Sequence, residues 1–280
     1  MRYLFISDVH GEFDKMLKAL SEAKFNPETD TLVTVGDMFD RGPDSKEILE
    51  YLLELPHTIF IYGNHDLRLK ELILGQDRAN QCDKSNGLNE TLKSFCKDAG
   101  DWRKSNSPSD IMWLIRLLKS DSRLEKTYKN LWKYFDKCVY AIEFSDLIAT
   151  HAWIPVYEDF NGGVRTMSYC EYWKEAPKWL WYETSWIDSA KCIKCRVHKK
   201  IDKNLLIGHY HSWRIAQLFL GVEVVKEVNK GEITINQEEI SKIRQVDNVI
   251  AIDGCVNFEN GKVLVYEYNS NEEPIEYRGE

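Results

Sequence analysis

Aspartate, asparagine and histidine residues follow short apolar segments at several places in this sequence. Carboxylate, amide and imidazole groups without thiolate are a ligand set suited to manganese, iron, zinc or magnesium ions. Most of the seven histidines of the chain belong to these groups; only His57 and His198 lie outside them. The groups are Asp8-Val9-His10, Gly36-Asp37-Met38-Phe39-Asp40-Arg41-Gly42, Gly63-Asn64-His65-Asp66, His151 and Gly208-His209-Tyr210-His211.

Each group alone also has an ordinary structural explanation. An Asp-x-His sequence after a strand commonly forms a turn or a helix cap, and Gly-Asp and Gly-Asn are common turn dipeptides. A single histidine such as His151 is more often a core or surface residue than a ligand. Chance does not readily place every group at the end of an apolar segment. The complete set therefore favours a metal site.

The intervening segments alternate between strand and helix patterns. Residues 3–7, 31–35 and 58–62 are short apolar runs that predict strands. Residues 12–23 and 44–55 carry apolar side chains at helical spacing. This order predicts an α/β fold in which helices cover a sheet of parallel strands. Because the carboxyl ends of such strands converge on one crevice, the polar groups should meet in space.

The pattern changes after residue 66. Residues 67–140 are predicted to be a helical insertion, with helices at 110–119 and 124–140, within a single domain that spans 1–280. Residues 222–240 fit either a charged hairpin or a helix. Strands are predicted to return at 146–150, 205–207, 249–253 and 262–268.

Composition narrows the class of partner. The formal net charge is -8, so the chain offers no basic surface for nucleic acid or an anionic membrane. No stretch reaches the ~20 apolar residues of a membrane span, and the apolar N-terminal run is too short for a signal peptide. We therefore expect a cytoplasmic protein with no membrane or nucleic-acid partner.

The cysteine pattern leaves one small alternative open. The chain has seven cysteines, an odd number scattered over its length, which argues against a secreted disulfide framework. Cys170, Cys192, Cys195 and His198 could form a zinc clip, although the usual second tight ligand pair is missing. The other interpretation is ordinary reduced thiols.

The motifs together resemble the calcineurin-like metallophosphoesterase superfamily. The Asp40-Arg41-Gly42 sequence is similar to that of its phosphoprotein phosphatase (PPP) branch, and the resemblance is closest to bacterial and phage serine/threonine phosphatases and to symmetric diadenosine tetraphosphatases. Asn86-Gly87 with residues 91–95, and Ile252-Asp253-Gly254-Cys255, resemble further segments of those enzymes. The resemblance implies a four-layer α/β/β/α sandwich of two mixed sheets with a helical insertion.

The resemblance also implies two divalent metal ions. A carboxylate such as Asp37 can give one oxygen to each ion and thus bridge them. By resemblance, Asp8 and His10 hold the first ion, and Asn64, His151 and His209 hold the second. The Gly-His-x-His form of residues 208–211 is found in the wider superfamily, which predicts His211 as a further ligand of the first ion. If the strand continued past Gly208, His209 and His211 would face the same side.

The remaining roles follow from the chemistry of phosphoester cleavage. Two ions lower the pKa of a bridging water, and the hydroxide attacks phosphorus directly. His65 is the candidate general acid, and Asp40 would orient its ring. The planar guanidinium group of Arg41 can donate hydrogen bonds to two phosphate oxygens. Arg41, Asn64 and His65 are accordingly expected to contact the substrate.

The expected activity is hydrolysis of phosphomonoesters, in a small molecule or at phosphoserine or phosphothreonine in a protein. The alternatives are hydrolysis of a dinucleoside polyphosphate such as diadenosine tetraphosphate, a phosphodiesterase, and a binding module with an inactive metal site. Glu183 stands where bacterial PPP relatives often carry a second phosphate-binding arginine. Tryptophans could line a substrate groove or belong to the core, namely Trp173, Trp179, Trp181 and Trp186.

Overall fold

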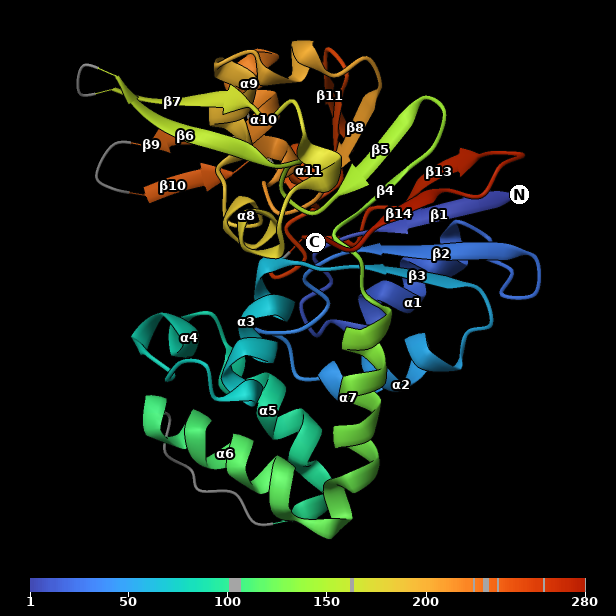
Figure 1. Cartoon of the computed structure of the whole chain (residues 1–280), viewed down its shortest axis with the longest axis vertical. Helices are drawn as coiled ribbons and strands as arrows, with labels where there is room; N and C mark the ends of the chain where they lie inside the picture. Colours follow the sequence, from blue (N-terminus) through green and yellow to red (C-terminus); the bar gives the residue numbers. More distant parts are fainter. Residues whose placement is uncertain are drawn as a thin grey trace.

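Two mixed β-sheets lie face to face in the centre of the molecule, as seen in the computed structural model (Figure 1). The structure describes residues 1–100, 107–161, 164–223, 225–228, 232–235, 237–258 and 260–279.

The first sheet has four strands in the order β13-β1-β2-β3. β1 pairs with β2 in parallel, from Arg2 opposite Asp30 to Ile6 opposite Thr34, and β2 pairs with β3 in parallel. The helices α1 and α2 connect these strands, as the sequence predicted. The bounds are β1 (Arg2–Ile6), α1 (Phe13–Glu22), β2 (Asp30–Val35), α2 (Ser45–Glu54), β3 (Thr58–Ile61) and β13 (Tyr266–Asn269). The predicted strand 262–268 was placed too early, since pairing with β1 begins only at Tyr266.

The second sheet has six strands in the order β11-β12-β8-β5-β4-β14, and β5, β8 and β12 are parallel. Its strands are β4 (Ala141–Glu143), β5 (Leu147–Thr150), β8 (Asn204–Ile207), β11 (Arg244–Val246), β12 (Val249–Ala251) and β14 (Ile275–Tyr277). The helices on its outer side are α8 (Lys178–Thr184), α9 (Ser189–Lys194) and α10 (Ser212–Phe219).

Two hairpins stand beside the second sheet: β6 (Val156–Asn161) with β7 (Val164–Tyr169), and β9 (Val225–Val228) with β10 (Glu232–Ile235). A short helix, α11 (Gln237–Ile240), follows the second hairpin. Both interpretations of residues 222–240 therefore hold in part, although residues 224, 229–231 and 236 lie outside the described part. Short 3-10 turns occur at Lys97–Ala99, Ser122–Leu124, Trp173–Glu175 and Val197–Lys200.

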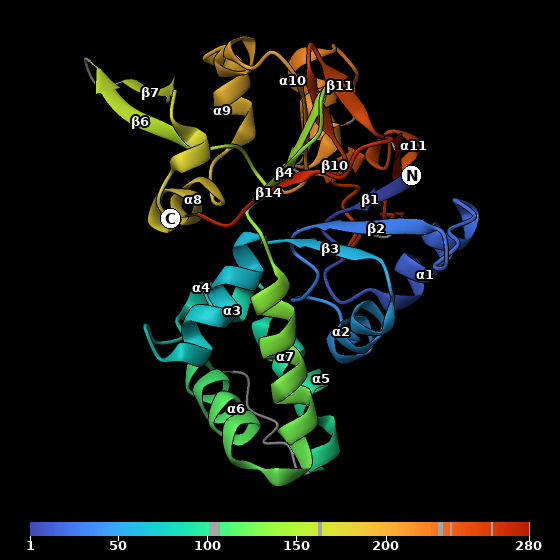
Figure 2. The same ribbon diagram turned by 45° about the vertical axis from the view of Figure 1, so that its right-hand side comes forward.

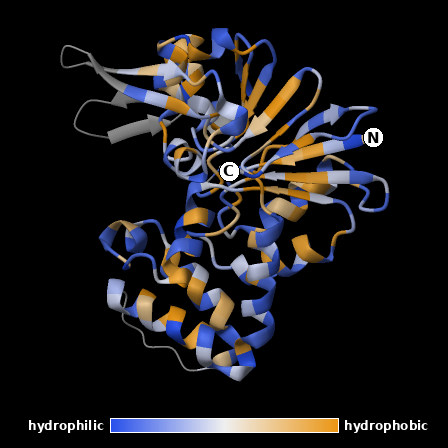
Figure 3. Ribbon diagram, viewed as in Figure 1, coloured by the Kyte–Doolittle hydropathy of each residue, from blue (hydrophilic) through white to orange (hydrophobic). Residues whose placement is uncertain are grey.

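Alternating side chains divide the core into layers. In β1, Tyr3 and Phe5 point into the space between the sheets, while Leu4 and Ile6 face the helices on the other side. In the second sheet, Leu206 points inward to the same space and Leu205 faces outward. The strongly apolar residues accordingly gather along the central strands and inner helix faces (Figure 3). The result is the expected four-layer α/β/β/α sandwich.

The predicted insertion is helical and projects from one end of the molecule (Figures 1 and 2). Its aromatic core continues the core of the sandwich, because Phe39 meets Phe95 and Tyr134 at ring-centroid distances of 5.4 and 5.2 Å. The helices are α3 (Asn64–Leu74), α4 (Gln81–Ser85), α5 (Leu88–Cys96), α6 (Pro108–Ser120) and α7 (Glu125–Lys137). None of the helices in the described ranges is both long and apolar enough to cross a membrane.

Candidate metal centre

The loops after β1 and β2 are joined by backbone hydrogen bonds. The N–H of Asp8 donates to the carbonyl of Gly36 at 3.1 Å, and the N–H of His10 donates to the carbonyl of Asp37 at 3.1 Å. Because both strands end on the same side of the sheet, these hydrogen bonds hold the first two sequence motifs next to each other. The expected convergence at the carboxyl ends of the strands is thus confirmed for these two loops.

The backbone of the site is unusual in conformation. Left-handed φ angles are rare for residues other than glycine and persist where the surrounding structure enforces them. Six of the ten described non-glycine residues with positive φ belong to the predicted site. They are Asp8, His10, Asp37, Asp40, Arg41 and His209, with φ between 47° and 71°. Such a concentration is typical of a functional site rather than of ordinary turns.

Two glycines allow the loops to approach one another. A Cβ atom on Gly63 would lie 2.1 Å from Oδ1 of Asp37, and one on Gly208 would lie 1.8 Å from Oγ of Ser7. Both distances are far below van der Waals contact. These positions therefore accept only glycine if Asp37 and the loop after β1 are to keep their places.

Asp37 lies at the centre of three imidazoles. Its Oδ2 atom is 3.3 Å from Nε2 of His151, 3.8 Å from Nε2 of His65 and 3.9 Å from Nε2 of His10. Its Oδ1 atom accepts a 3.0 Å hydrogen bond from the backbone N–H of His65. Burial by itself raises the pKa of Asp37, but the surrounding histidines lower it well below the usual value. The carboxylate is therefore held ionised, as a metal ligand must be.

The tautomers of two histidines suit metal binding. Nδ1 of His10 lies 2.9 Å from the carbonyl oxygen of Phe39, and Nδ1 of His151 lies 2.8 Å from that of Val35. A carbonyl can only accept, so Nδ1 carries the proton in both rings. Burial lowers the pKa of His10 well below its usual value, so this ring is neutral and its Nε2 keeps a lone pair for a metal ion. Burial also lowers the pKa of His151, but Asp37 outweighs it and raises that pKa to about 10, so Nε2 of His151 donates to its acceptors here and would give up that proton to a metal ion.

The remaining predicted ligands lie near His10 and His151. Oδ1 of Asn64 lies 2.9 Å from Nε2 of His151, and Oδ1 of Asp8 lies 3.8 Å from Nε2 of His10. The backbone N–H of His209 donates to Oδ2 of Asp8 at 2.9 Å. Two overlapping sets of candidate ligands result: His10, Asp37 and His65, and Asp37, His151 and His209. Since Asp37 belongs to both sets, the donors fit two neighbouring divalent ions with a shared carboxylate.

His211 is placed differently from the others. β8 ends at Ile207, His209 has a φ of 57°, and His211 is the residue that precedes α10. The assumption of an extended strand past Gly208 was therefore wrong, because the chain turns there to start a helix. Nε2 of His211 lies 3.7 Å from Oδ2 of the buried Asp253, and these two residues form a third group with Cys255.

The candidate acid, His65, is held by a chain of side chains. Nδ1 of His65 lies 2.6 Å from Oδ2 of Asp40, and Oδ1 of Asp40 accepts a 3.0 Å hydrogen bond from the hydroxyl of Thr91. Burial lowers the pKa of His65, but Asp37 and Asp40 outweigh it and raise that pKa to about 9. The predicted contact between Asp40 and His65 is present, and it favours the protonated ring.

The sequence did not assign a role to two residues of this region. Thr91 of α5 also accepts a 2.7 Å hydrogen bond from the backbone N–H of Asp40. Asp66 accepts hydrogen bonds from the backbone N–H groups of Asp37 and Gly63, at 3.0 and 2.9 Å. Asp66 stands inside the Gly63-Asn64-His65-Asp66 motif and was thus detectable, whereas Thr91 reaches the site only through tertiary packing.

Arg41 is exposed at the rim of the site, and its Nη1 atom donates to Oδ1 of Asn257 at 3.4 Å. The tryptophans considered earlier divide into two kinds. Trp173 and Trp181 are buried, while Trp179 is 58% and Trp186 is 41% exposed. The core interpretation therefore holds for Trp173 and Trp181, and the groove interpretation stays a prediction.

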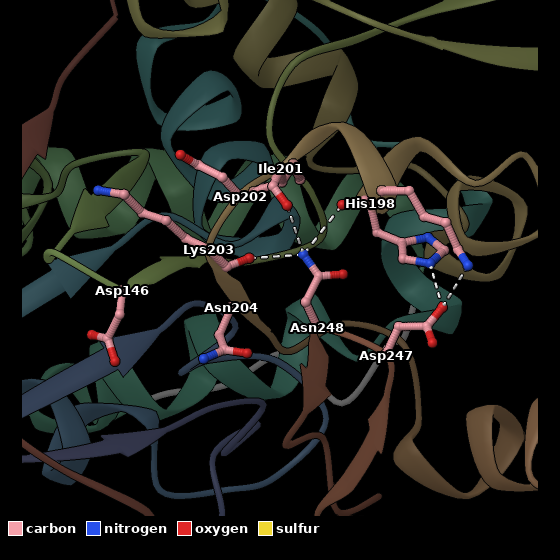
Figure 4. A pocket seen from close by; sticks show the side chains of 9 residues that line it. Asp146, His198, Ile201, Asp202, Lys203, Asn204, Asp247 and Asn248 are labelled. Atoms are coloured by element: carbon pink, nitrogen blue, oxygen red, sulfur yellow. Dashed lines mark hydrogen bonds and ion pairs between the residues drawn. The ribbon is translucent and has the colours of Figure 1, made fainter.

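The suggested zinc clip does not assemble. Nε2 of His198 pairs with Oδ2 of Asp247 at 2.9 Å, and the candidate metal groups of the described residues include none of Cys170, Cys192 and Cys195. His198 instead lines a pocket of about 380 Å³ (Figure 4). In this pocket the amide of Asn248 donates to the carbonyls of His198, Ile201 and Lys203. Asp146, Asn204 and Asn248 place it at the amino ends of β5, β8 and β12, the opposite sheet edge from the metal centre.

The chain belongs to the calcineurin-like phosphoesterase family, whose profile matches residues 1–235. Among curated proteins it is similar to the symmetrical bis(5'-nucleosyl)-tetraphosphatase of Klebsiella pneumoniae (strain 342), with 38% identity over 91 residues. The enzyme of the same name from Salmonella newport (strain SL254) is 37% identical over 91 residues. Each match covers 32% of this chain and 32% of the relative, so the chain spans about a third of the length of these relatives.

Two solved structures are similar at low identity. A metallophosphoesterase from Sphaerobacter thermophilus is 15% identical with a TM-score of 0.43, covering 100% of this chain and 88% of that one. A serine/threonine phosphatase from Saccharomyces cerevisiae is 12% identical with a TM-score of 0.40, covering 98% and 81%. Membership of the family rests on the sequence match over residues 1–235.

Proposed function

We propose that this protein is a metal-dependent phosphomonoesterase that acts on phosphoserine or phosphothreonine in proteins or on a small phosphorylated substrate. The observation that carries the proposal is the position of Asp37, whose Oδ2 atom faces Nε2 of His10, His65 and His151. A carboxylate shared between two sets of nitrogen and oxygen donors is the arrangement that a pair of catalytic ions requires.

In this proposal Asp8 and His10 would hold the first ion, Asn64, His151 and His209 would hold the second, and Asp37 would serve both. His211 would join the first ion. Manganese is the ion that we propose, and iron, zinc and magnesium suit the same donors. When bound, the ions would supply an activated water for direct attack and neutralise charge on the phosphoryl oxygens.

The chain's own residues would supply the proton and the orientation. His65 donates a proton to the leaving oxygen, and Asp40 keeps Nδ1 of that ring protonated so that Nε2 faces the reacting group. Arg41 and Asn64 contact the phosphate, and the exposed guanidinium of Arg41 is free to turn toward an incoming oxyanion because Asn257 holds it by one long hydrogen bond.

Hydrolysis of a dinucleoside polyphosphate is the second candidate. It is favoured by the 91-residue similarity to symmetrical bis(5'-nucleosyl)-tetraphosphatases. The phosphodiesterase alternative has no specific observation in its favour. The cytoplasmic location and the lack of a nucleic-acid partner stay predictions.

A substrate panel with manganese tests the proposal. The panel contains a phosphoserine peptide, diadenosine tetraphosphate, an aryl phosphate and an aryl phosphodiester, each assayed with the wild type and with Asp37→Asn as the inactive control. We expect turnover of the monoesters that disappears on chelation and returns with manganese. If the diester or the dinucleotide is turned over and the monoesters are not, the phosphomonoesterase proposal is wrong.

A further inference from the structure

An exposed tryptophan lies beside the candidate general acid. The ring centroids of Trp186 and His65 are 6.4 Å apart, and the two planes are inclined by 30°. Trp186 remains 41% exposed to solvent, although large aromatic side chains usually bury most of their surface. A large part of an aromatic side chain is therefore open to solvent next to the residue that would protonate the leaving group.

The position of this indole is tied to the helix that carries His65. Trp186 follows α8, and the hydroxyl of Tyr182 in α8 lies at the contact between this helix and α3. That hydroxyl donates to Oε2 of Glu71 at 3.1 Å, and Glu71 accepts from Arg68 at 2.7 Å. Glu71 and Arg68 belong to α3, which begins with Asn64 and His65. The helix that precedes Trp186 is thus held against the helix that carries His65.

The orientation of His65 defines the side on which the leaving group departs. Its Nδ1 atom is bound by Asp40, so only Nε2, 3.8 Å from Oδ2 of Asp37, can serve the reaction. The ring of His10 meets the His65 ring edge to face at a centroid distance of 5.0 Å. Trp186 also borders the His65 ring, and its exposure to solvent makes it accessible to a substrate.

We propose that Trp186 is a platform on which a planar ring of the leaving group stacks, so that the site selects phosphoesters with an aromatic or nucleoside leaving group. Aromatic rings pair favourably at centroid distances of about 4.5–7 Å. When His65 protonates the leaving oxygen, a ring attached to that oxygen would lie within this distance of the Trp186 ring. The base of a nucleoside leaving group would do the same. The inference rests on the proposed function and adds a substrate class to it.

Stacking acts on the ground state and the transition state alike, since the ring takes no part in the chemistry. Its loss should therefore raise KM and leave kcat nearly unchanged. When an aromatic side chain that stacks on a base is replaced by alanine, binding of the base weakens on the order of ten- to a hundred-fold.

The test compares Trp186→Ala and Trp186→Phe with Trp179→Ala, a matched control that removes the exposed tryptophan of α8. Each manganese-loaded variant is assayed with phenyl phosphate, diadenosine tetraphosphate and a phosphoserine peptide without aromatic residues. We expect a raised KM for a ring-bearing substrate in Trp186→Ala, partial recovery in Trp186→Phe, and no change in Trp179→Ala or with the peptide. Comparison of phenyl phosphate with diadenosine tetraphosphate shows whether an aryl group or a nucleoside stacks on Trp186.

Binding gives a readout that does not depend on turnover. Phenylphosphonate and methylphosphonate carry similar anions and differ by the ring, and their affinities can be measured by calorimetry. Trp186→Ala should weaken the first and spare the second. An equal loss on all substrates and both phosphonates would mean that Trp186 only positions His65, and unchanged constants would mean that the indole is not used; either overturns the inference. Failure of the wild type on every substrate would instead contradict the proposed function.

Discussion

Asp66 accepts a 3.0 Å hydrogen bond from the backbone N–H of Asp37, and its side chain is fully buried. The same Oδ2 atom accepts a 2.9 Å hydrogen bond from the backbone N–H of Gly63. A residue outside the ligand set thus joins the loops after β2 and β3 and fixes the backbone of the central carboxylate. Burial raises the pKa of Asp66 to about 7, with Asp37 adding to the effect.

Asp66→Ala should destabilise the protein by about 2–5 kcal/mol, because two buried N–H groups lose their acceptor. Asp66→Asn keeps an oxygen acceptor of the same shape, and its amide nitrogen replaces the buried oxygen that has no partner. We expect a loss below about 1 kcal/mol for this control. Urea unfolding of both variants measures the difference. Equal losses would show that the hydrogen bonds do not matter.

Gly63→Ala should disrupt the metal centre by steric contact alone. The backbone of Gly63 has a φ of -94°, which alanine adopts readily, but the new Cβ would meet Oδ1 of Asp37. Gly75→Ala is the control, since Gly75 has a φ of 75° and open space around it. It should cost about 1 kcal/mol of stability and leave metal content intact. Metal analysis of the two purified variants decides the matter; normal content in Gly63→Ala would contradict the packing account.

His65→Asn should keep both ions and lower the rate by about 10²–10⁴-fold, because a general acid is removed and no ligand is lost. The loss should shrink for nitrophenyl phosphate, whose leaving group needs no proton. Steady-state kinetics on an alkyl and a nitrophenyl ester, with metal analysis alongside, make the comparison. Since His65 also lies in a candidate ligand set with His10 and Asp37, a missing ion in this variant would reassign it as a ligand.

His211→Ala should weaken one ion selectively, and His209→Ala should weaken the other. Asp253→Asn should resemble His211→Ala, because Asp253 faces the imidazole of His211 at 3.7 Å and would orient it. Manganese titration by calorimetry separates the two affinities. If His211→Ala leaves both affinities and the rate untouched, His211 is not a ligand and the site is of the plain PPP type.

The sequence predicted most of the layout because strand ends carry the chemistry. Asp37 and His151 come from different sheets, yet each follows an apolar run, and the structure brings their side chains to 3.3 Å. The alternation of residues such as Tyr3 and Leu4 likewise follows from strand geometry. These features depend on local pattern and on a general rule of α/β sheets.

Other features depend on contacts that no local pattern encodes. Thr91 supports Asp40 because α5 of the insertion packs against the loop after β2. The direction of His211 depends on where β8 stops and α10 starts. Trp186 meets His65 only through the packing of α8 on α3.

The bridging role of Asp37 is tested most directly by counting the metal ions bound to Asp37→Asn. Wild type, Asp37→Asn and Asn64→Ala are loaded with manganese, freed of excess ion and analysed for metal per chain, with turnover of an aryl phosphate measured on the same samples. The account predicts two ions in the wild type, less metal in Asp37→Asn than in Asn64→Ala, and no turnover in Asp37→Asn. Two fully occupied sites in Asp37→Asn would contradict it.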